Sequence, residues 1–188
     1  MLRFGTCSWK YDSWEGIVYT YSKSKNYLKK YSQKFNTVEI DQWFWSLFSP
    51  AKVLLPQKSI VEEYRKSVPD DFLFTIKVPN SITLTHFYKE AKEDQLIPNQ
   101  FFLSVELFDE FLNAIVPIRK QVGCLIFQFE YLTKQKMKSL SEFQSRFAEF
   151  QKKLSNDVPP IGIEIRNPNY LNEKYFEFLS EQSLAPVF

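Results

Sequence analysis

Short β-type runs alternate with amphipathic segments along this sequence, and that alternation limits the fold more than any other feature. Each run has about five to seven residues, the usual length of a strand. No two runs are joined by a segment typical of a hairpin turn. Strict alternation of strands and helices predicts a parallel sheet with right-handed crossovers. The predicted strands are Leu2–Cys7, Thr37–Asp41, Phe72–Val78, Cys124–Phe129, Ile161–Ile165 and Leu184–Phe188.

Apolar residues recur at helical spacing between these runs. Leu140, Phe143 and Phe147 follow the i, i+3, i+7 rhythm, and the segment from Phe101 to Ile115 does the same. A chain of 188 residues can bury a full core, so we expect one domain over residues 1–188. The predicted helices are Asn26–Phe35, Lys58–Val68, Phe101–Ile115, Leu140–Leu154 and Leu171–Gln182.

The predicted strands are apolar on one face only. Val38 and Ile40 alternate with Glu39 and Asp41, and the runs starting at Phe72 and Ile161 alternate in the same way. A doubly wound sheet is covered by helices on both faces, so its strands would be apolar throughout. The alternation instead predicts an α/β fold of the TIM-like (β/α) barrel type, with the charged face in the lumen. A phosphate-binding loop is not expected, because no glycine-rich motif follows the first run and the whole chain has only four Gly.

Charge and cysteine usage exclude several classes of partner. The net charge is +2, from 24 basic and 22 acidic residues that are interspersed, so we expect no nucleic-acid partner. Cys7 and Cys124 lie in apolar runs without metal-site spacing, which indicates a reducing compartment. No apolar stretch is long enough to cross a membrane, and the first run starts too early for a signal peptide. We therefore expect a cytoplasmic protein with no membrane association.

Five ordered motifs carry a resemblance to a known family. They are GTCSWKYDSWEG (5–16), FNTVEIDQWFW (35–45), FLFTIKVPNSITLTH (72–86), VGCLIFQFEYL (122–132) and IGIEIRNPNY (161–170). The chain resembles the domain of unknown function 72 family, also called YecE-like proteins, which are similar to TIM barrels. The resemblance implies the barrel fold but brings no settled activity with it. Its first motif departs from the family pattern at Cys7 and Ser8, and its second does so from Asp41 to Trp45, so we do not expect a substrate shared with relatives.

The family barrel has eight strands, whereas the sixth predicted strand of this chain ends at Phe188. The resemblance therefore implies a barrel truncated after the sixth strand, from a fragment of a longer product or a truncated reading frame. Open sheet edges would favour self-association.

The predicted lumenal side chains are the candidate site, because charges in a low-dielectric lumen must pair with each other or face a ligand. One interpretation is an enzyme in which Arg166 and Lys77 hold an anionic or hydroxyl-rich group while Glu39 or Glu164 moves a proton. The alternative is a structural ion-pair network. The lumenal set consists of Glu39, Asp41, Lys77, Gln128, Glu164 and Arg166.

His86 is the one histidine of the chain, and it lies in a segment, Asn80–Gln100, that is long for a connector. We predict that it acts as an acid, a base or a ligand, alongside the catalytic candidates Glu39, Lys77 and Glu164.

Aromatic residues follow the first two predicted strands and are expected on the rim of the site. Flat rings stack on sugars or bases, although they also pack long loops. These ligand-binding candidates are Trp9, Tyr11, Trp14, Trp43 and Trp45, added to Arg166, Asp41 and Gln128.

A divalent cation such as Mg²⁺ or Mn²⁺ at Glu39, Asp41, Glu164 and His86 is chemically allowed, but the spacing does not require it, so no metal ligand is assigned. The cofactor remains unknown. Two function classes stand: an acid–base enzyme (hydrolase, lyase or isomerase) acting on a small polar, sugar-like or anionic ligand, and a non-catalytic ligand-binding barrel. Fold alone does not choose between them.

Overall fold

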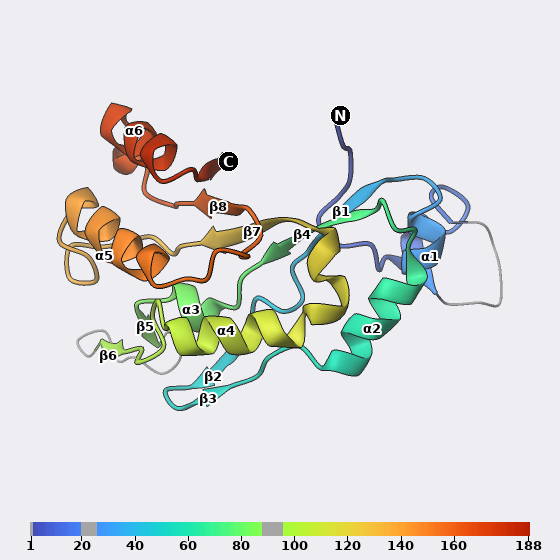
Figure 1. The fold of residues 1–188 in the computed structure, drawn as a ribbon, viewed down its shortest axis with the longest axis horizontal. Helices are drawn as coiled ribbons and strands as arrows, with labels where there is room; N and C mark the ends of the chain where they lie inside the picture. Colours follow the sequence, from blue (N-terminus) through green and yellow to red (C-terminus); the bar gives the residue numbers. More distant parts are fainter. Residues whose placement is uncertain (1, 20–25, 88–95) are drawn as a thin grey trace.

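A five-stranded parallel sheet forms the centre of the chain in the computed structural model, which describes residues 2–19, 26–87 and 96–188 (Figure 1). The strand order β1-β4-β7-β8-β9 follows the order of the chain. Right-handed crossovers that all step in one direction leave the helices on one face of the sheet. The predicted parallel α/β class is confirmed. The strands are β1 (Thr37–Ile40), β4 (Leu73–Lys77), β7 (Val122–Gln128), β8 (Ile161–Glu164) and β9 (Ala185–Val187).

The predicted first strand, Leu2–Cys7, is wrong. Cys7 forms only an isolated parallel bridge with Glu39, where the Glu39 amide donates to the Thr6 carbonyl (3.0 Å) and the Ser8 amide to the Glu39 carbonyl (3.0 Å). Ser8 has a φ of 64°, in the left-handed region, so the chain leaves the extended conformation directly after the bridge.

The structure thus has five parallel strands in an open sheet, one fewer than the six strands predicted. Over the described ranges β9 pairs with β8 alone, and no strand pairing closes the sheet.

The expectation that the chain has no hairpins is also wrong. Strand β2 (Leu47–Ser49) pairs antiparallel with β3 (Lys52–Val53), and β5 (His86–Phe87) pairs antiparallel with β6 (Ile97–Pro98). The two pairs follow β1 and β4, so both extend the carboxyl edge of the sheet, on the lower left of Figure 1. Strands of two or three residues are too short to show a period-two pattern.

The predicted helices are confirmed, with shorter ends than the sequence indicated. Ser104, Ser139 and Asn172 begin three of them, each accepting a backbone amide at the first turn. In the described part of the chain no helix is both long and apolar enough to cross a membrane. The helices are α1 (Tyr27–Tyr31), α2 (Lys58–Ser67), α3 (Asn80–Thr83), α4 (Val105–Ala114), α5 (Leu140–Lys152) and α6 (Glu173–Glu181), with 3-10 turns η1 (Asp12–Trp14), η2 (Val116–Gln121) and η3 (Pro168–Tyr170).

The two faces of the sheet differ as the alternation predicts. Val38, Ile40, Phe74 and Ile76 are buried on the apolar face. Phe127 on the same face contacts Phe108 of α4 (5.5 Å between ring centroids) and Phe147 of α5 (5.4 Å). The opposite face is half-buried and polar, and it presents Glu39, Thr75, Lys77, Gln128 and Glu164.

Candidate functional site

Two ion pairs lie on the polar face of the sheet. Lys77 Nζ is 3.4 Å from Glu39 Oε1, and Arg166 contacts Glu164 Oε1 at 2.8 Å. Strand alternation and register place both carboxylates on this face, since Glu39 pairs with Thr75 of β4 and Glu164 with Gln128 of β7. These predicted catalytic residues thus share a face, but each carboxylate has its own cation.

The four charged residues of the predicted lumenal set form two pairs, which lie on either side of β7. Lys77 of β4 is paired with Ile126 of β7, whereas Glu164 of β8 is paired with Gln128 of β7. Ile126 and Gln128 lie on the same face, two residues apart, so the two ion pairs are offset along the strands. This stagger between neighbouring strands cannot be read from any one strand.

Cys7 is held between two carboxylates at the bridge to β1. Its Sγ donates to Glu39 Oε1 (3.2 Å) and Asp41 Oδ2 (3.5 Å). Partial desolvation of the thiol, which belongs to an otherwise exposed residue, and the Glu39 carboxylate raise the pKa of Cys7 to about 12, so the thiol stays protonated at neutral pH. A protonated thiol is a poor nucleophile, and Cys7 therefore acts as a donor to Glu39 and Asp41.

A pocket of about 470 Å³ opens at the carboxyl ends of β7 and β8. It brings together three of the predicted ligand-binding residues, Trp45, Gln128 and Arg166. Trp45 is 63% exposed and Tyr131 is 55% exposed, so both rings are accessible to a ligand. The buried Gln128 Oε1 has no hydrogen-bond partner within the described residues. The full lining is Phe44, Trp45, Leu84, Gln128, Phe129, Glu130, Tyr131 and Arg166.

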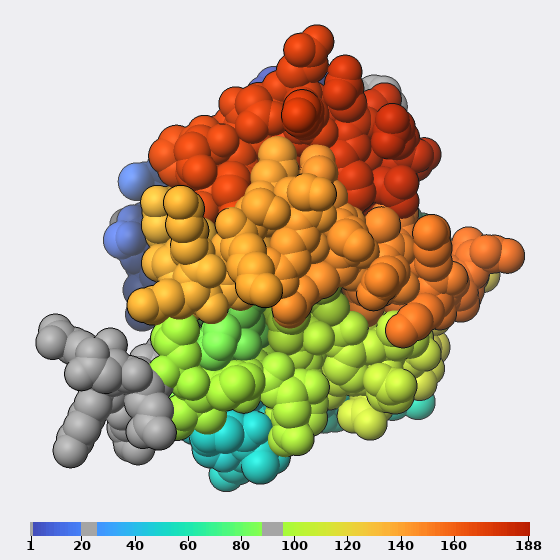
Figure 2. All heavy atoms as spheres, turned by 90° about the vertical axis from the view of Figure 1, so that its left-hand side faces the viewer, coloured from blue at the N-terminus to red at the C-terminus, as the bar shows by residue number. Residues whose placement is uncertain are grey.

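Figure 2 views the molecule from the left-hand side of Figure 1. The β2–β3 region (cyan) is at the bottom, the segments around α5 (orange) cross the middle, and the C-terminal region (red) is at the top. Segments far apart in the sequence thus meet on this side of the molecule.

A buried asparagine fixes the turn that carries Trp45. The Asn80 backbone N–H donates to the Phe44 carbonyl (2.7 Å), and the side-chain Oδ1 of Asn80 accepts from the backbone amides of Ser46 (2.9 Å) and Leu47 (3.0 Å). Asn80 is fully buried, so its hydrogen bonds do not compete with water. Residues on both sides of Trp45 are therefore tied to the segment that follows β4.

His86 does not line this pocket, but it contacts Thr85, which is hydrogen-bonded to the pocket residue Glu130. Its Nδ1 lies 2.9 Å from Thr85 Oγ1, and Thr85 donates to Glu130 of the pocket wall (2.8 Å). Burial and the neighbouring Lys136 lower the pKa of His86. Residues 88–95 of the segment predicted to carry His86 lie outside the described residues.

Sequence reasoning missed Glu130 and Tyr131 as pocket residues. Glu130 continues the alternation of Ile126 and Gln128, so the motif around β7 could have assigned it. Phe44 and Leu84 carried no such signal, because they approach the pocket from two loops.

The other predicted rim residues pack the loops instead of lining the pocket. Trp9 is buried and meets Tyr64 edge-on (5.1 Å), while Trp43 stacks on the same ring (5.6 Å). Tyr11 packs on Trp14 (4.7 Å). Of the five aromatic candidates, only Trp45 reaches the pocket at the carboxyl ends.

The metal site considered from the sequence is not assembled. Over residues 2–19, 26–87 and 96–188, no group of three or more His, Cys, Asp or Glu side chains is placed to hold a metal ion. His86 pairs with Thr85, and Glu164 with Arg166. Glu39 and Asp41 both accept from the Cys7 thiol, and Glu39 also pairs with Lys77.

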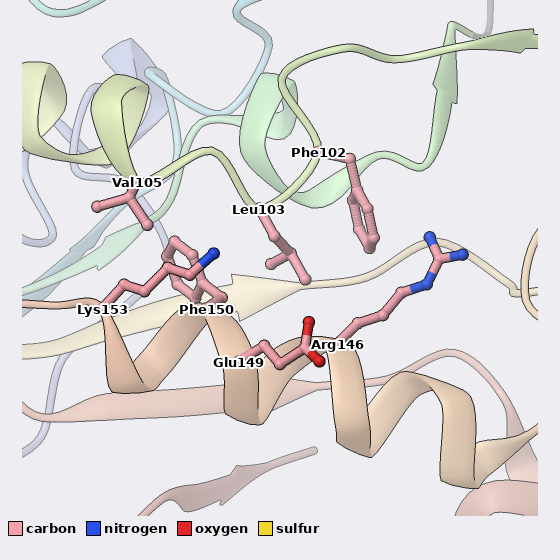
Figure 3. Close-up of a pocket in the computed structure, with 7 residues that line it drawn as sticks. All are labelled: Phe102, Leu103, Val105, Arg146, Glu149, Phe150 and Lys153. Atoms are coloured by element: carbon pink, nitrogen blue, oxygen red, sulfur yellow. The ribbon is translucent and has the colours of Figure 1, made fainter.

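A second pocket of about 250 Å³ lies between α5 and the segment that leads into α4 (Figure 3). Arg146, Glu149 and Lys153 from the α5 side surround apolar side chains, including Leu103 and Phe150. Arg146 is already paired with Glu142 at 2.7 Å. This pocket is on the helix-covered side of the sheet, apart from the two ion pairs, and is not the candidate site.

The geometry defines an α/β protein with a parallel sheet and a pocket at the carboxyl ends of its strands, which is where such folds bind ligands. The chain belongs to the family described as protein of unknown function DUF72, whose match spans residues 3–188.

Two crystal structures of DUF72 family proteins are similar to the chain. That from Enterococcus faecalis V583 has a TM-score of 0.63 and 23% identity, covering 99% of this chain and 60% of that one. That from Thermotoga maritima MSB8 has a TM-score of 0.62 and 21% identity, covering 99% of this chain and 64% of that one. The chain thus spans less than two thirds of the length of either protein. No curated protein matches the chain. At this identity the likeness concerns the fold alone.

Proposed function

We propose that the chain binds a small, sugar-like ligand in the pocket at the carboxyl ends of β7 and β8. The observation that supports this most is that the accessible rings of Trp45 and Tyr131 line one pocket together with Gln128 and Arg166. Sugar rings offer apolar faces that stack on aromatic side chains, and hydroxyl groups that polar side chains orient. Gln128 lines the same pocket, and its side-chain amide is a group that can orient a ligand hydroxyl.

The ion pairs favour binding over proton transfer by Glu39 or Glu164. Each carboxylate is neutralised by its own cation, at 3.4 Å in one pair and 2.8 Å in the other. A carboxylate that contacts its own cation orients that cation and the neighbouring groups. We therefore assign Glu39, Lys77 and Asp41 to the support of the polar face, and Arg166 to a ligand hydroxyl or anionic group.

We also propose that the open sheet is part of a TIM-like arrangement within one domain, as in YecE-like proteins, and that the protein acts in the cytoplasm. Strand order equal to chain order and helices on one face support the barrel interpretation, since a doubly wound sheet reverses its order. In such an arrangement the pocket would open on the face where barrel enzymes bind substrates.

The test is a titration of the 188-residue protein with glucose, ribose and their phosphates. Tryptophan fluorescence and the NMR signals of the backbone amides measure the affinity for each compound. We expect Trp45→Ala and Arg166→Ala each to weaken binding by about tenfold or more, because each removes one side of the pocket. Trp45→Phe keeps a stacking ring and should retain most of the affinity. Trp43→Phe, on the Tyr64 stack outside the pocket, is the matched control.

The proposal fails if none of the four compounds binds. It also fails if binding survives both alanine substitutions unchanged.

A further inference from the structure

A pocket of about 390 Å³ adjoins the candidate pocket at the carboxyl ends of β7 and β8. The two pockets share Tyr131 in their linings. They also divide two consecutive residues between them, since Arg166 lines the candidate pocket and Asn167 the adjoining one. We call the adjoining pocket the lysine pocket, because Lys134 and Lys138 line it.

The border between the two pockets is fixed by a buried asparagine. The side-chain Oδ1 of Asn167 accepts from the Leu132 backbone amide (2.7 Å), and its Nδ2 donates to the Leu132 carbonyl (2.9 Å). Asn167 is 2% exposed, so water does not compete for these hydrogen bonds. Tyr131 directly precedes Leu132 and is accessible from both pockets. One ligand can therefore contact Tyr131 and extend into both pockets.

The charged side chains of the candidate pocket already have partners. Arg166 contacts Glu164 at 2.8 Å, and Glu130 pairs with Lys136. The pocket thus has one cation and one anion in its wall, each neutralised by a neighbouring charge. A strongly anionic group gains little net attraction there.

The lysine pocket has the opposite balance of charge. Lys134 and Lys138 line it, and no acidic side chain does. Both lysines are exposed, and neither forms an ion pair with another of the described residues. Two ammonium groups in one wall attract an anion and donate charge-assisted hydrogen bonds to it.

One carboxylate approaches the backbone of this wall. Glu142 Oε2 accepts from the Lys138 backbone amide (2.7 Å). Glu142 does not line the pocket, and its Oε1 contacts Arg146 at 2.7 Å, so this carboxylate has a cation of its own. The first turn of α5 is capped by Ser139, whose Oγ accepts from the Glu142 amide (3.2 Å). The positive charge of the lysine pocket therefore comes from the two ammonium groups and not from the start of the helix.

We propose that the lysine pocket holds the phosphate of a sugar phosphate whose sugar ring lies against Trp45 and Tyr131 in the candidate pocket. This inference rests on the proposed function, because the candidate pocket supplies the site of the sugar ring. A phosphate monoester carries about 1.5 to 2 negative charges at neutral pH and three acceptor oxygens. The ammonium groups of Lys134 and Lys138 and the hydroxyl of Thr133, which also lines the lysine pocket, are the donors for these oxygens.

The first measurement compares each sugar with its own phosphate in the 188-residue protein. We expect the phosphates of ribose and glucose to bind about tenfold or more tightly than the parent sugars, because the phosphate adds charge-assisted contacts. Added NaCl should reduce this difference, since salt screens exposed charges. The affinity for the parent sugars should change little with salt.

Removing both ammonium groups tests their role. The double substitution Lys134→Gln, Lys138→Gln should abolish the advantage of the phosphates and leave the affinity for the parent sugars unchanged. Both side chains are exposed, so the fold is retained. The double substitution Lys152→Gln, Lys174→Gln is the matched control, because it removes the same charge at exposed positions outside both pockets. It should keep the advantage of the phosphates.

NMR of the backbone amides locates each part of the ligand. Inorganic phosphate alone should shift the signals of Thr133 and Asn169, which line the lysine pocket. Ribose alone should shift those of Trp45 and Gln128 in the candidate pocket. Ribose phosphate should shift both groups of signals, as a ligand that spans Tyr131 requires.

The inference is overturned if the sugar phosphates bind no more tightly than the parent sugars, or if the variant without Lys134 and Lys138 keeps their advantage. Sugar binding in the candidate pocket then still supports the proposed function. If inorganic phosphate shifts the signals of the lysine pocket but no sugar shifts those of the candidate pocket, the phosphate site is supported and the proposed function is contradicted. If neither the sugars nor inorganic phosphate shift these signals, both are wrong.

Discussion

At the scale of single residues, the two carboxylates around Cys7 change the chemistry of its thiol. We predict that iodoacetamide alkylates Cys7 at about pH 8 at least tenfold more slowly than a free thiol, although the residue is exposed. A pKa raised to about 12 leaves less thiolate at every pH below that value, so reactivity should increase only at strongly alkaline pH. Mass spectrometry over a pH series, in a Cys124→Ala background, measures the rate.

The double substitution Glu39→Gln, Asp41→Asn is the control for the cause of this slow reaction. It keeps the size of both side chains but removes the negative charges, and should speed alkylation of Cys7. A rate equal to that of a free thiol in the unmodified chain would show that the carboxylates do not control this thiol.

At the scale of elements, the short bridge between the N-terminal segment and β1 depends on close backbone approach at Gly5. A Cβ at this position would lie 2.1 Å from the Thr37 carbonyl oxygen, so Gly5→Ala must displace the segment. We expect a loss of about 2 kcal/mol in the free energy of unfolding, because two backbone hydrogen bonds at Glu39 are broken. Denaturant titration measures this loss.

Gly123→Ala is the matched control, since its Cβ would meet the Leu73 side chain at 3.2 Å and that side chain can move. We expect a clearly smaller change there. Equal losses at both glycines would mean that the bridge contributes nothing particular to stability.

At the scale of the whole molecule, β9 pairs with β8 alone in the described part of the chain, so its other side is an unpaired strand edge. Val187 is part of this strand, and Phe188 beside it is 89% exposed. Exposed strand edges pair with other copies of a chain, so we predict that the 188-residue polypeptide self-associates as its concentration rises. The substitutions Val187→Lys and Phe188→Lys should reduce this association, because charged side chains protect a strand edge.

Light scattering over a concentration series tests the prediction. Leu54→Lys adds a similar charge at an exposed position outside β9 and should leave association unchanged. A monodisperse monomer at all concentrations would contradict a role for the edge.

Local periodicity was sufficient to predict the parallel sheet, its two unlike faces and the five longer helices. Alternation such as Val38–Glu39–Ile40 records which side of a strand is buried, and it is visible without any knowledge of neighbouring strands. The same pattern placed Glu39, Lys77 and Glu164 on one polar face, where the structure has them.

The tertiary structure alone decided which of these side chains meet. Register separated Glu39–Lys77 from Glu164–Arg166, and positive φ at Ser8 ended the first predicted strand. Thr85 and Glu130, 45 residues apart in the chain, came together because β4 and β7 are neighbours with long connections at the same edge. Periodicity reports the burial of each residue, whereas a pocket depends on contacts between segments whose spacing leaves no repeat in the sequence.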